Sequence, residues 1–372
     1  MNEVSPSQLA PYVTGGAFLL AFIFGAVANK TDFCTMGAVS DWVNMGDFNR
    51  MRMWLLAIAV ALLASSALQL AGAVDLAKSI YPGPSFTWLS YVVGGFLFGV
   101  GMTLGSGCGS KTLIRIGGGN LKSVIVYVFL GIAAYMTLRG VLGAFRVGVL
   151  EKATLVLSSG QDLPSLLSSF TNTGKTAWTA ALAALIGSGI VAFVYSSKEF
   201  RASFNYTLGG VVTGLVVAGG WYVSGHLGHL VEDPNTLQEA FVATNTGRME
   251  SFSFVAPLAY SLDYLMFWTD KSRIVTYGIA SVAGVIAGSA AYALATKKFR
   301  WEGFRDAEDT GMHILGGLLM GFGGICALGC TIGQAITGFS TLALGSIITF
   351  AFIVLGSAAT MKLQYWRMAR EG

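Results

Sequence analysis

The chain has 372 residues, of which 54% are hydrophobic and only 11% charged, and its formal net charge is +4 at pH 7. Soluble domains usually carry about a quarter charged residues, and a soluble fold this apolar would expose large adhesive patches. The mean hydropathy of +0.64 favours an all-α polytopic membrane protein, and the unbroken apolar runs exclude a transmembrane β-barrel.

Nine apolar segments are long enough to cross a membrane, since a spanning helix needs about 20 apolar residues. They are 13–29, 54–74, 90–106, 123–142, 178–196, 207–222, 275–296, 313–329 and 341–361. A weaker segment, 251–268, contains Pro257 and Asp263. The Lys and Arg groups that flank the spans fall on one side only if 251–268 does not cross. We therefore predict that 251–268 is re-entrant or lies in a cavity, with the N-terminus outside and the C-terminus cytoplasmic.

An internal repeat divides the chain. Residues 94–108 align with 316–330 at a constant offset of 222, and both copies end in Gly-Cys. A weaker match pairs 14–26 with 208–220. We predict a single transporter domain over residues 1–372. Its two inverted halves would cover about 12–142 and 206–362, with a variable connection over about 143–205, because transporters often arise from such duplications.

The repeated Gly-Cys motifs, "GSGCGSKT" at 105–112 and "ALGCTIGQ" at 327–334, are typical of turns. We expect their glycines to adopt positive φ, and a half-helix that starts after such a turn would offer free N–H groups to an anion. The predicted anion-binding residues are Gly107, Gly109, Ser110, Lys111, Gly329 and Thr331. The alternative is that the glycines only allow close helix packing, as we expect for Gly95/Gly99 and Gly317/Gly321.

Three of the four cysteines stand at predicted span ends: Cys34, Cys108 and Cys330. They are candidates for a disulfide pair plus one thiol, for metal ligands, or for soft contacts along a path. Zinc sites need four ligands and no second ligand pair accompanies them, so we expect no metal and no cofactor. Cys326 aligns with Leu104 in the repeat, so we predict that it lines the helix core. No nucleophile–base pair or nucleotide motif indicates an enzyme, and no basic stripe indicates nucleic-acid binding.

Three motifs resemble those of the YeeE/YedE family of membrane proteins, a sulfur-transport family whose characterised members take up thiosulfate. They are "KTDFCTMGAVSD", "GGFLFGVGMTLGSGCGS" and "FRDAEDTGMHILGGLLMGFGGICALGCTIGQ". The stretch "ESFSFVAP" departs from a pattern closer to Gly-Ile-Thr-Ser-Pro in that family. The resemblance implies an hourglass-shaped protein of a bacterial inner membrane, with loops that dip to its middle from both sides.

The same resemblance implies that Cys34, Cys108 and Cys330 line the path and pass thiosulfate along by S–H···S hydrogen bonds. It also implies a small cytosolic sulfur-carrier protein as a partner, in addition to the lipid bilayer. We expect the three thiols to stay protonated, since a thiolate would repel the anion. Three alternatives stay open: transport of another sulfur or selenium species such as sulfite, a membrane sulfur relay through cysteine persulfides, and a sensor that binds without flux.

Overall fold

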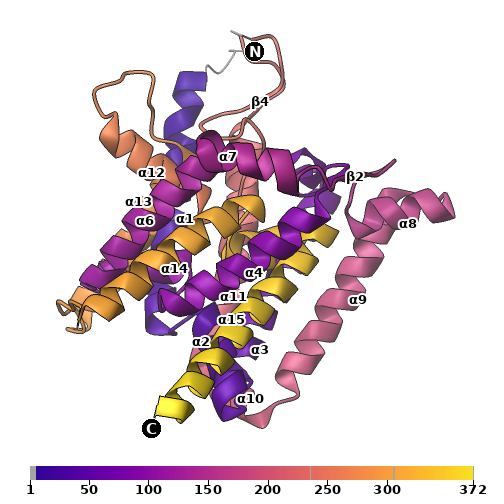
Figure 1. Ribbon diagram of the computed structural model, residues 1–372. Coiled ribbons are helices and arrows are strands. Elements are labelled where there is room, and N and C mark those ends of the chain that lie inside the picture. The colour runs from indigo at the N-terminus through magenta and orange to yellow at the C-terminus, as the bar shows by residue number, and fades with distance from the viewer. Residues whose placement is uncertain (1–5, 235, 305, 372) are drawn as a thin grey trace.

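The computed structural model describes residues 6–234, 236–304 and 306–371 and is built almost entirely of helices (Figure 1). The long helices are α1 (Pro6–Lys30), α3 (Asn49–Leu70), α4 (Trp88–Leu104), α6 (Leu121–Arg139), α9 (Lys175–Tyr195), α11 (Phe204–Tyr222), α13 (Tyr277–Ala295), α14 (Ala307–Cys326) and α15 (Leu344–Glu371). Short helices connect them: α2 (Thr35–Ser40), η1 (Asp41–Met45), η2 (Leu76–Lys78), α5 (Gly109–Gly117), α7 (Val141–Phe145), η3 (Arg146–Leu150), α8 (Leu163–Thr171), α10 (Lys198–Ala202), η4 (Val223–Leu227), α12 (Ala256–Met266), η5 (Thr331–Gly338) and η6 (Phe339–Thr341).

The strands are two antiparallel pairs of two residues each. β1 (Ser85–Phe86) pairs with β2 (Leu155–Val156), and β3 (His229–Leu230) pairs with β4 (Ala240–Phe241). In Figure 1, β2, β4 and α7 lie at the end of the molecule where α1 begins, opposite α10 and the C-terminus. We call these ends the α7 face and the C-terminal face.

Nine helical segments of the described residues are long and apolar enough to cross a membrane, in agreement with the nine predicted spans. Segment 251–268 is not among them. Its first residues run as irregular backbone, and it then forms the short helix α12 beside α6 and α13. This placement agrees with the prediction that it does not cross.

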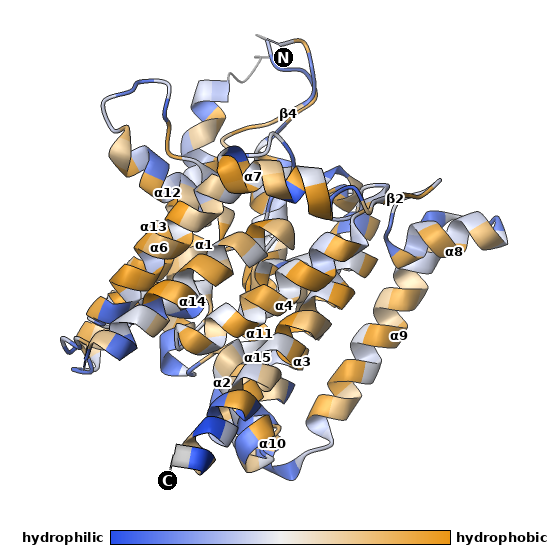
Figure 2. Cartoon of the chain, in the orientation of Figure 1, coloured by the Kyte–Doolittle hydropathy of each residue, from blue (hydrophilic) through white to orange (hydrophobic). Residues whose placement is uncertain are grey.

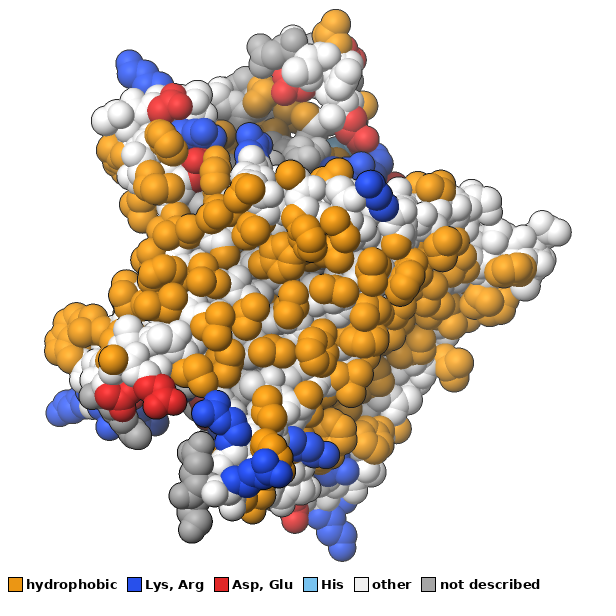
Figure 3. Space-filling model, viewed as in Figure 1, with side chains coloured by type: hydrophobic (Ala, Val, Ile, Leu, Met, Phe, Trp, Pro, Cys, Tyr) orange, Lys and Arg blue, Asp and Glu red, His pale blue; other side chains and the backbone are white. Residues whose placement is uncertain are grey.

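An apolar belt surrounds the helices. Figure 2 shows apolar residues along the middle of the long helices, and Figure 3 shows them exposed across the body, with Lys, Arg, Asp and Glu gathered toward the two ends. Large side chains such as Leu185, 72% exposed, and Leu355, 54% exposed, belong to helices long enough to span. The lipid tails of a bilayer cover such a surface without cost, so the protein is a multi-pass membrane protein.

Polar caps fix where several helices begin, because a helix leaves its first N–H groups without partners. Asn120 accepts the N–H of Ser123 at the start of α6. Asp306 accepts the N–H of Asp309 at the start of α14. Asparagine and aspartate are favoured at this position, so the register of both helices follows from local sequence.

Glycines set the packing of the central helices. A Cβ on Gly95 or Gly99 of α4 would lie within 2.8 Å of the α15 backbone, and one on Gly321 of α14 would lie 2.4 Å from an α6 carbonyl. The predicted close-packing role of these glycines is therefore confirmed. α4 and α14 also cross at glycines, since a Cβ on Gly101 would lie 2.7 Å from the carbonyl oxygen of Gly316.

Two further pairs complete the core: α1 packs along α13, and α3 packs along α11. Helix α9 stands at the edge of the molecule with α8 (Figure 1). Of the nine candidate spans among the described residues, it has the smallest share of residues buried inside the protein. It belongs to the variable connection predicted over 143–205. The central helices therefore come from the segments on either side of that connection.

Candidate functional site

Three cysteines occupy equivalent places, each as the residue that caps the start of a short helix. Cys34 precedes α2, Cys108 precedes α5 and Cys330 precedes η5. All three are at most 4% exposed and have extended backbone conformations. All three predicted path cysteines therefore lie at the same kind of turn, where the chain leaves a long helix and begins a short one.

The three turns follow the same backbone path. Two residues before each cysteine the chain adopts a left-handed conformation, at Asp32 (φ 53°), Ser106 (φ 56°) and Leu328 (φ 58°). The residue before each cysteine then donates its N–H to the carbonyl five residues earlier: Phe33 to Ala28 (3.0 Å), Gly107 to Met102 (2.9 Å) and Gly329 to Gly324 (2.8 Å). This pattern belongs to a helix end of the Schellman type, and it gives all three cysteines the same exit geometry.

The expected positive φ at Gly107, Gly109 and Gly329 is wrong. The residues with left-handed backbone are Ser106 and Leu328, while the three glycines keep ordinary φ values. Gly109 instead provides space, because a Cβ there would lie 2.4 Å from the carbonyl oxygen of Phe254. At Gly107 and Gly329 the nearest contacts would be side-chain atoms at 3.1 and 3.3 Å, so those two positions are less constrained.

Each thiol sulfur is held by a local hydrogen bond. The N–H of Gly37 donates to Cys34 Sγ over 3.4 Å, and Cys108 Sγ lies 3.3 Å from the hydroxyl of Ser110. Cys330 Sγ accepts two N–H groups, from Gly333 at 3.3 Å and from Phe254 at 3.2 Å. A sulfur that accepts such bonds keeps its own S–H as a weak donor toward a passing group.

The irregular stretch before α12 joins two of these turns. The peptide of Phe254 gives its N–H to Cys330 and presses its carbonyl against Gly109, the residue after Cys108. The Phe254 ring stacks on Phe24 at 5.9 Å between centroids, and Phe24 meets Phe33, which precedes Cys34, edge to face at 6.3 Å. All these side chains are buried, so one apolar contact chain links the three cysteine turns.

Two buried hydroxyls beside the cysteines lack hydrogen-bond partners. Thr35 follows Cys34 and Thr331 follows Cys330, and the Oγ1 of each is without a partner among the described residues. Leaving a buried hydroxyl unpaired costs about 1–3 kcal/mol, and such groups in native structures commonly serve a ligand or an ordered water. Thr331 was a predicted site residue. Thr35 was not, although the repeated Cys-Thr pair was visible in the sequence.

Lys111 does not stand free at a path entrance. Its ammonium group contacts the carboxylate of Asp32, which also accepts a hydrogen bond from Arg50 at 2.6 Å. Arg50 in turn lies 3.3 Å from Asp41. Lys111 therefore ties α5 to the turn before Cys34, and its charge is balanced by its neighbours.

A cavity of about 260 Å³ reaches the Cys330 turn from the side of the loops that carry β4. Its wall includes Tyr81, Arg146, Glu250, Ser253, Leu328 and Gly329. We call it the Arg146 cavity. Arg146 and Glu250 were not predicted as site residues, because one lies in the variable connection and the other stands outside the repeated motifs. A solute at the α7 face could therefore reach the Cys330 turn through this cavity.

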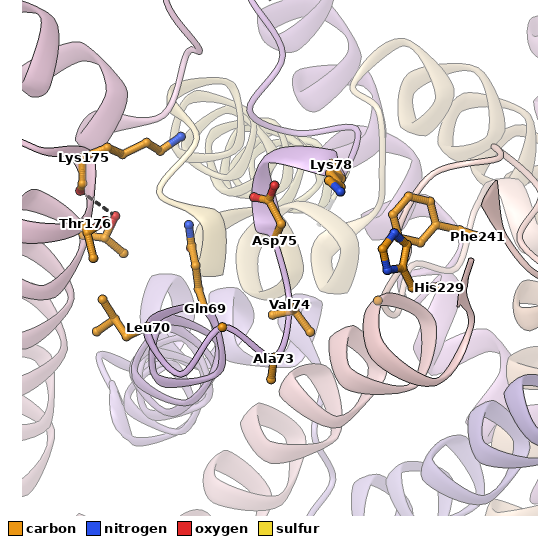
Figure 4. Close-up of a pocket in the computed structure, with 13 residues that line it drawn as sticks. Gln69, Leu70, Ala73, Val74, Asp75, Lys78, Lys175, Thr176, His229 and Phe241 are labelled. Atoms are coloured by element: carbon orange, nitrogen blue, oxygen red, sulfur yellow. Dashed lines mark hydrogen bonds between the residues drawn. The ribbon is translucent and has the colours of Figure 1, made fainter. Parts of the chain in front are cut away.

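A second cavity, of about 450 Å³, lies between α3, α9 and η4 and does not include a cysteine turn (Figure 4). Lys175 reaches into it from one side, and Lys78 and His229 lie on the other. Both lysines are already paired, Lys175 with Asp162 at 3.1 Å and Lys78 with Glu239. Its charges thus stabilise the loops around it.

The four cysteines are free thiols, so none of the sequence-based disulfide alternatives is formed in the structure. Within the described residues, no group of three or more His, Cys, Asp or Glu side chains is arranged to hold a metal ion. Cys326 ends α14, and its Cβ packs against Gly94 of α4. It therefore belongs to the helix core, as predicted.

Comparison with known proteins shows to which family the chain belongs. A family model described as sulphur transport matches residues 30–359. A protein named thiosulfate transporter TsuA from Spirochaeta thermophila is 25% identical over 91% of this chain and 95% of its own length. A protein of the same name from Escherichia coli is also 25% identical, over 94% of each chain. Since the match covers most of the residues, including all three cysteine turns, the protein belongs to the sulphur transport family, whose members are transporters and not enzymes.

Proposed function

We propose that the protein imports thiosulfate across a bacterial inner membrane by passing the ion between Cys34, Cys108 and Cys330. The observation that carries this proposal is the shared construction of the three turns. Each cysteine caps a short helix, and the peptide of Phe254 connects two of the turns directly. Both curated relatives are named thiosulfate transporters.

The chemistry of the turns suits a soft oxyanion. The terminal sulfur of thiosulfate is polarizable, and a thiol offers it a weak S–H donor. The oxygens can be met by helix N–H groups at the starts of α2, α5 and η5 and by the unpartnered hydroxyls of Thr35 and Thr331. Conduction needs several moderate sites rather than one deep site, and three similar turns supply them.

We propose that Gly107, Gly109, Ser110, Gly329 and Thr331 form the anion-binding region. Two of these residues act indirectly, by shaping the turns. Gly109 gives Phe254 room, and Ser110 holds the Cys108 sulfur. Lys111 serves in the ion pair with Asp32. In this ion pair Lys111 orients the start of α5 and does not attract the anion directly.

We also propose that two inverted halves, about 12–142 and 206–362, build the path. The packing supports this reading. If α1 corresponds to α11 and α3 to α13, then exchanging the halves converts the α1–α13 pair into the α11–α3 pair. The same exchange converts the α4–α15 pair into the α14–α6 pair. Such interlocked repeats are common in transporters, where the substrate site lies at their interface.

The test is flux into proteoliposomes that contain the purified protein, with labelled thiosulfate, sulfite and sulfate compared. Cys108→Ala and Cys330→Ala should each lower thiosulfate uptake at least tenfold, while Cys326→Ala should transport like the wild type because that thiol packs in the core. Normal uptake by well-folded Cys108→Ala and Cys330→Ala variants would refute the cysteine path. Preference for sulfite would refute the assigned substrate.

A small cytosolic sulfur-carrier protein is the proposed partner, and it would bind at the C-terminal face. Purification of the transporter from its own cells, followed by identification of co-eluting small proteins, tests this. A carrier that binds equally well when the C-terminal face is blocked by a bulky fusion would contradict the proposed docking position.

A further inference from the structure

The Arg146 cavity contains two charged side chains that the proposed cysteine path does not use. Arg146 and Glu250 both line it together with Leu328 and Gly329, the two residues that precede Cys330 in the chain. An anion in this cavity would therefore lie among two charged side chains and the turn that carries a thiol.

Arg146 forms one ion pair and keeps one N–H donor without a partner among the described residues. One of its terminal nitrogens, Nη1, lies 3.0 Å from Glu151 Oε1, and its side chain is 17% exposed. Its Nε is buried and has no hydrogen-bond partner among the described residues. A buried guanidinium N–H without a partner is costly, and an oxyanion is the group that arginine binds best.

Glu250 stands at the end of the segment that leads to Phe254. Its Oε1 accepts hydrogen bonds from the N–H of Thr246 at 2.9 Å and from the Thr246 hydroxyl at 2.7 Å. Burial raises the pKa of the Glu250 carboxyl, and the hydrogen bonds from Thr246 offset that only in part. The proton is therefore held more firmly here than on an exposed glutamate.

Among the described residues that line the cavity, the other titratable groups apart from Arg146 are the phenols of Tyr81, Tyr260 and Tyr277, which carry no charge when protonated. Arg146 is the cation among the described lining residues, and Glu151 already balances it. An ionised Glu250 would leave the cavity with a net negative charge and repel a dianion. A protonated Glu250 removes that repulsion.

We propose that the Arg146 cavity binds the oxyanion together with a proton, with Arg146 contacting the anion and Glu250 carrying the proton. The inference rests on the proposed function, and it adds a link between anion entry and proton binding. The proton comes from the solution at the α7 face. No bond in the anion is made or broken, and the anion enters ionised because thiosulfate holds no proton near neutral pH.

The direct test is proton uptake on binding. Thiosulfate is titrated into the purified protein in lipid nanodiscs, in a weakly buffered solution with a pH indicator. Above the pKa of Glu250, each bound anion should draw in up to about one proton. Glu250→Gln should abolish the uptake. Glu239→Gln is the matched control, because that carboxylate lies outside the cavity beside Lys78, and it should leave the uptake unchanged.

A second measurement follows the pH dependence of affinity. For the wild type, binding should weaken as pH rises above the pKa of Glu250, by up to about tenfold per pH unit. For Glu250→Gln the affinity should be flat with pH. Arg146→Gln should weaken binding roughly tenfold or more at every pH, and Arg146→Lys should weaken it less.

These outcomes separate the inference from the proposed function. Thiosulfate binding and flux without proton uptake, or a pH dependence that survives in Glu250→Gln, would overturn the proton link and leave the transporter assignment intact. Absence of thiosulfate flux in the wild type would overturn the transporter assignment itself. Normal thiosulfate affinity of the Arg146→Gln variant would show that Arg146 does not contact the anion.

Discussion

At the scale of single residues, the structure separates two kinds of polar group near the thiols. Ser110 and Gly37 hold cysteine sulfurs in place, whereas the hydroxyls of Thr35 and Thr331 meet no partner in the described part of the chain. A buried group that is left unpaired works against folding. Because two such groups stand at matching places, each directly after a cysteine, we propose that a ligand pairs with them.

This explanation gives opposite predictions for stability and transport. Thr35→Val and Thr331→Val keep the side-chain shape and remove the unpaired hydroxyl, so the folded protein should be as stable as the wild type or up to about 1 kcal/mol more stable. Thiosulfate uptake should fall about tenfold, the loss expected for one hydrogen bond to an anion. Thermal unfolding and proteoliposome flux measure the two effects.

Thr296→Val is the control. That hydroxyl is exposed and bonds the Tyr292 carbonyl at 2.8 Å, so the substitution should leave uptake unchanged. If Thr35→Val and Thr331→Val transport normally, the hydroxyls do not contact the anion.

At the scale of elements, glycine rows decide how closely the central helices approach. The end of α4 touches the middle of α14, where a Cβ on Gly316 would lie 2.5 Å from the backbone nitrogen of Gly105. Because Gly105 directly precedes the left-handed residue Ser106, this crossing also positions the Cys108 turn. Helix packing and turn geometry are thus set by the same contact.

A pair of substitutions within α14 tests this contact. Gly316→Ala should destabilise the protein by about 1–3 kcal/mol, because the methyl group meets backbone that cannot move aside. Gly311→Ala has open space around its Cβ and should stabilise the helix by up to about 1 kcal/mol through helix propensity. Unfolding of the purified variants in mild denaturant compares them. Equal stability of the two variants would show that the helices separate readily.

The sequence predicted the long helices well because lipid imposes a length and a composition that are visible residue by residue. It also predicted that Cys34, Cys108 and Cys330 stand at turns after long helices, and that Gly95, Gly99, Gly317 and Gly321 allow close packing. It misplaced the positive φ, since the left-handed residues Ser106 and Leu328 have no compositional mark. It could not predict the contact of Phe254 with Cys330, which joins residues 76 positions apart, nor the roles of Arg146 and Glu250, which depend on the cavity they share.

At the scale of the whole molecule, the charged residues gather toward the two ends and the apolar belt lies between them (Figure 3). The α7 face carries the Arg146 cavity, while α2 lies toward the C-terminal face (Figure 1), with the Asp32–Lys111 ion pair beside the turn that precedes it. The cysteine turns therefore have different surroundings on their two sides. Import would proceed from the Arg146 cavity toward the Asp32 side.

The orientation of the chain can be measured with reporter fusions. A green fluorescent protein attached after residue 372 should fluoresce, because the C-terminal face is predicted to lie in the cytoplasm under the positive-inside rule. Alkaline phosphatase inserted in the loop at 157–160 should be active, because that loop lies at the opposite face. The reverse pattern would invert the proposed direction of import.

The interlocking of the helices constrains how the protein is made. α1 (Pro6–Lys30) packs along α13 (Tyr277–Ala295), so α1 lacks its main neighbour until the much later segment 277–295 has been synthesised. Its glycine-lined face, where a Cβ on Gly25 would lie 2.3 Å from the Val285 carbonyl, stays open to lipid for that time. Contacts between such distant segments form late. Assembly of the α1–α13 pair therefore has to wait until α13 has reached the membrane.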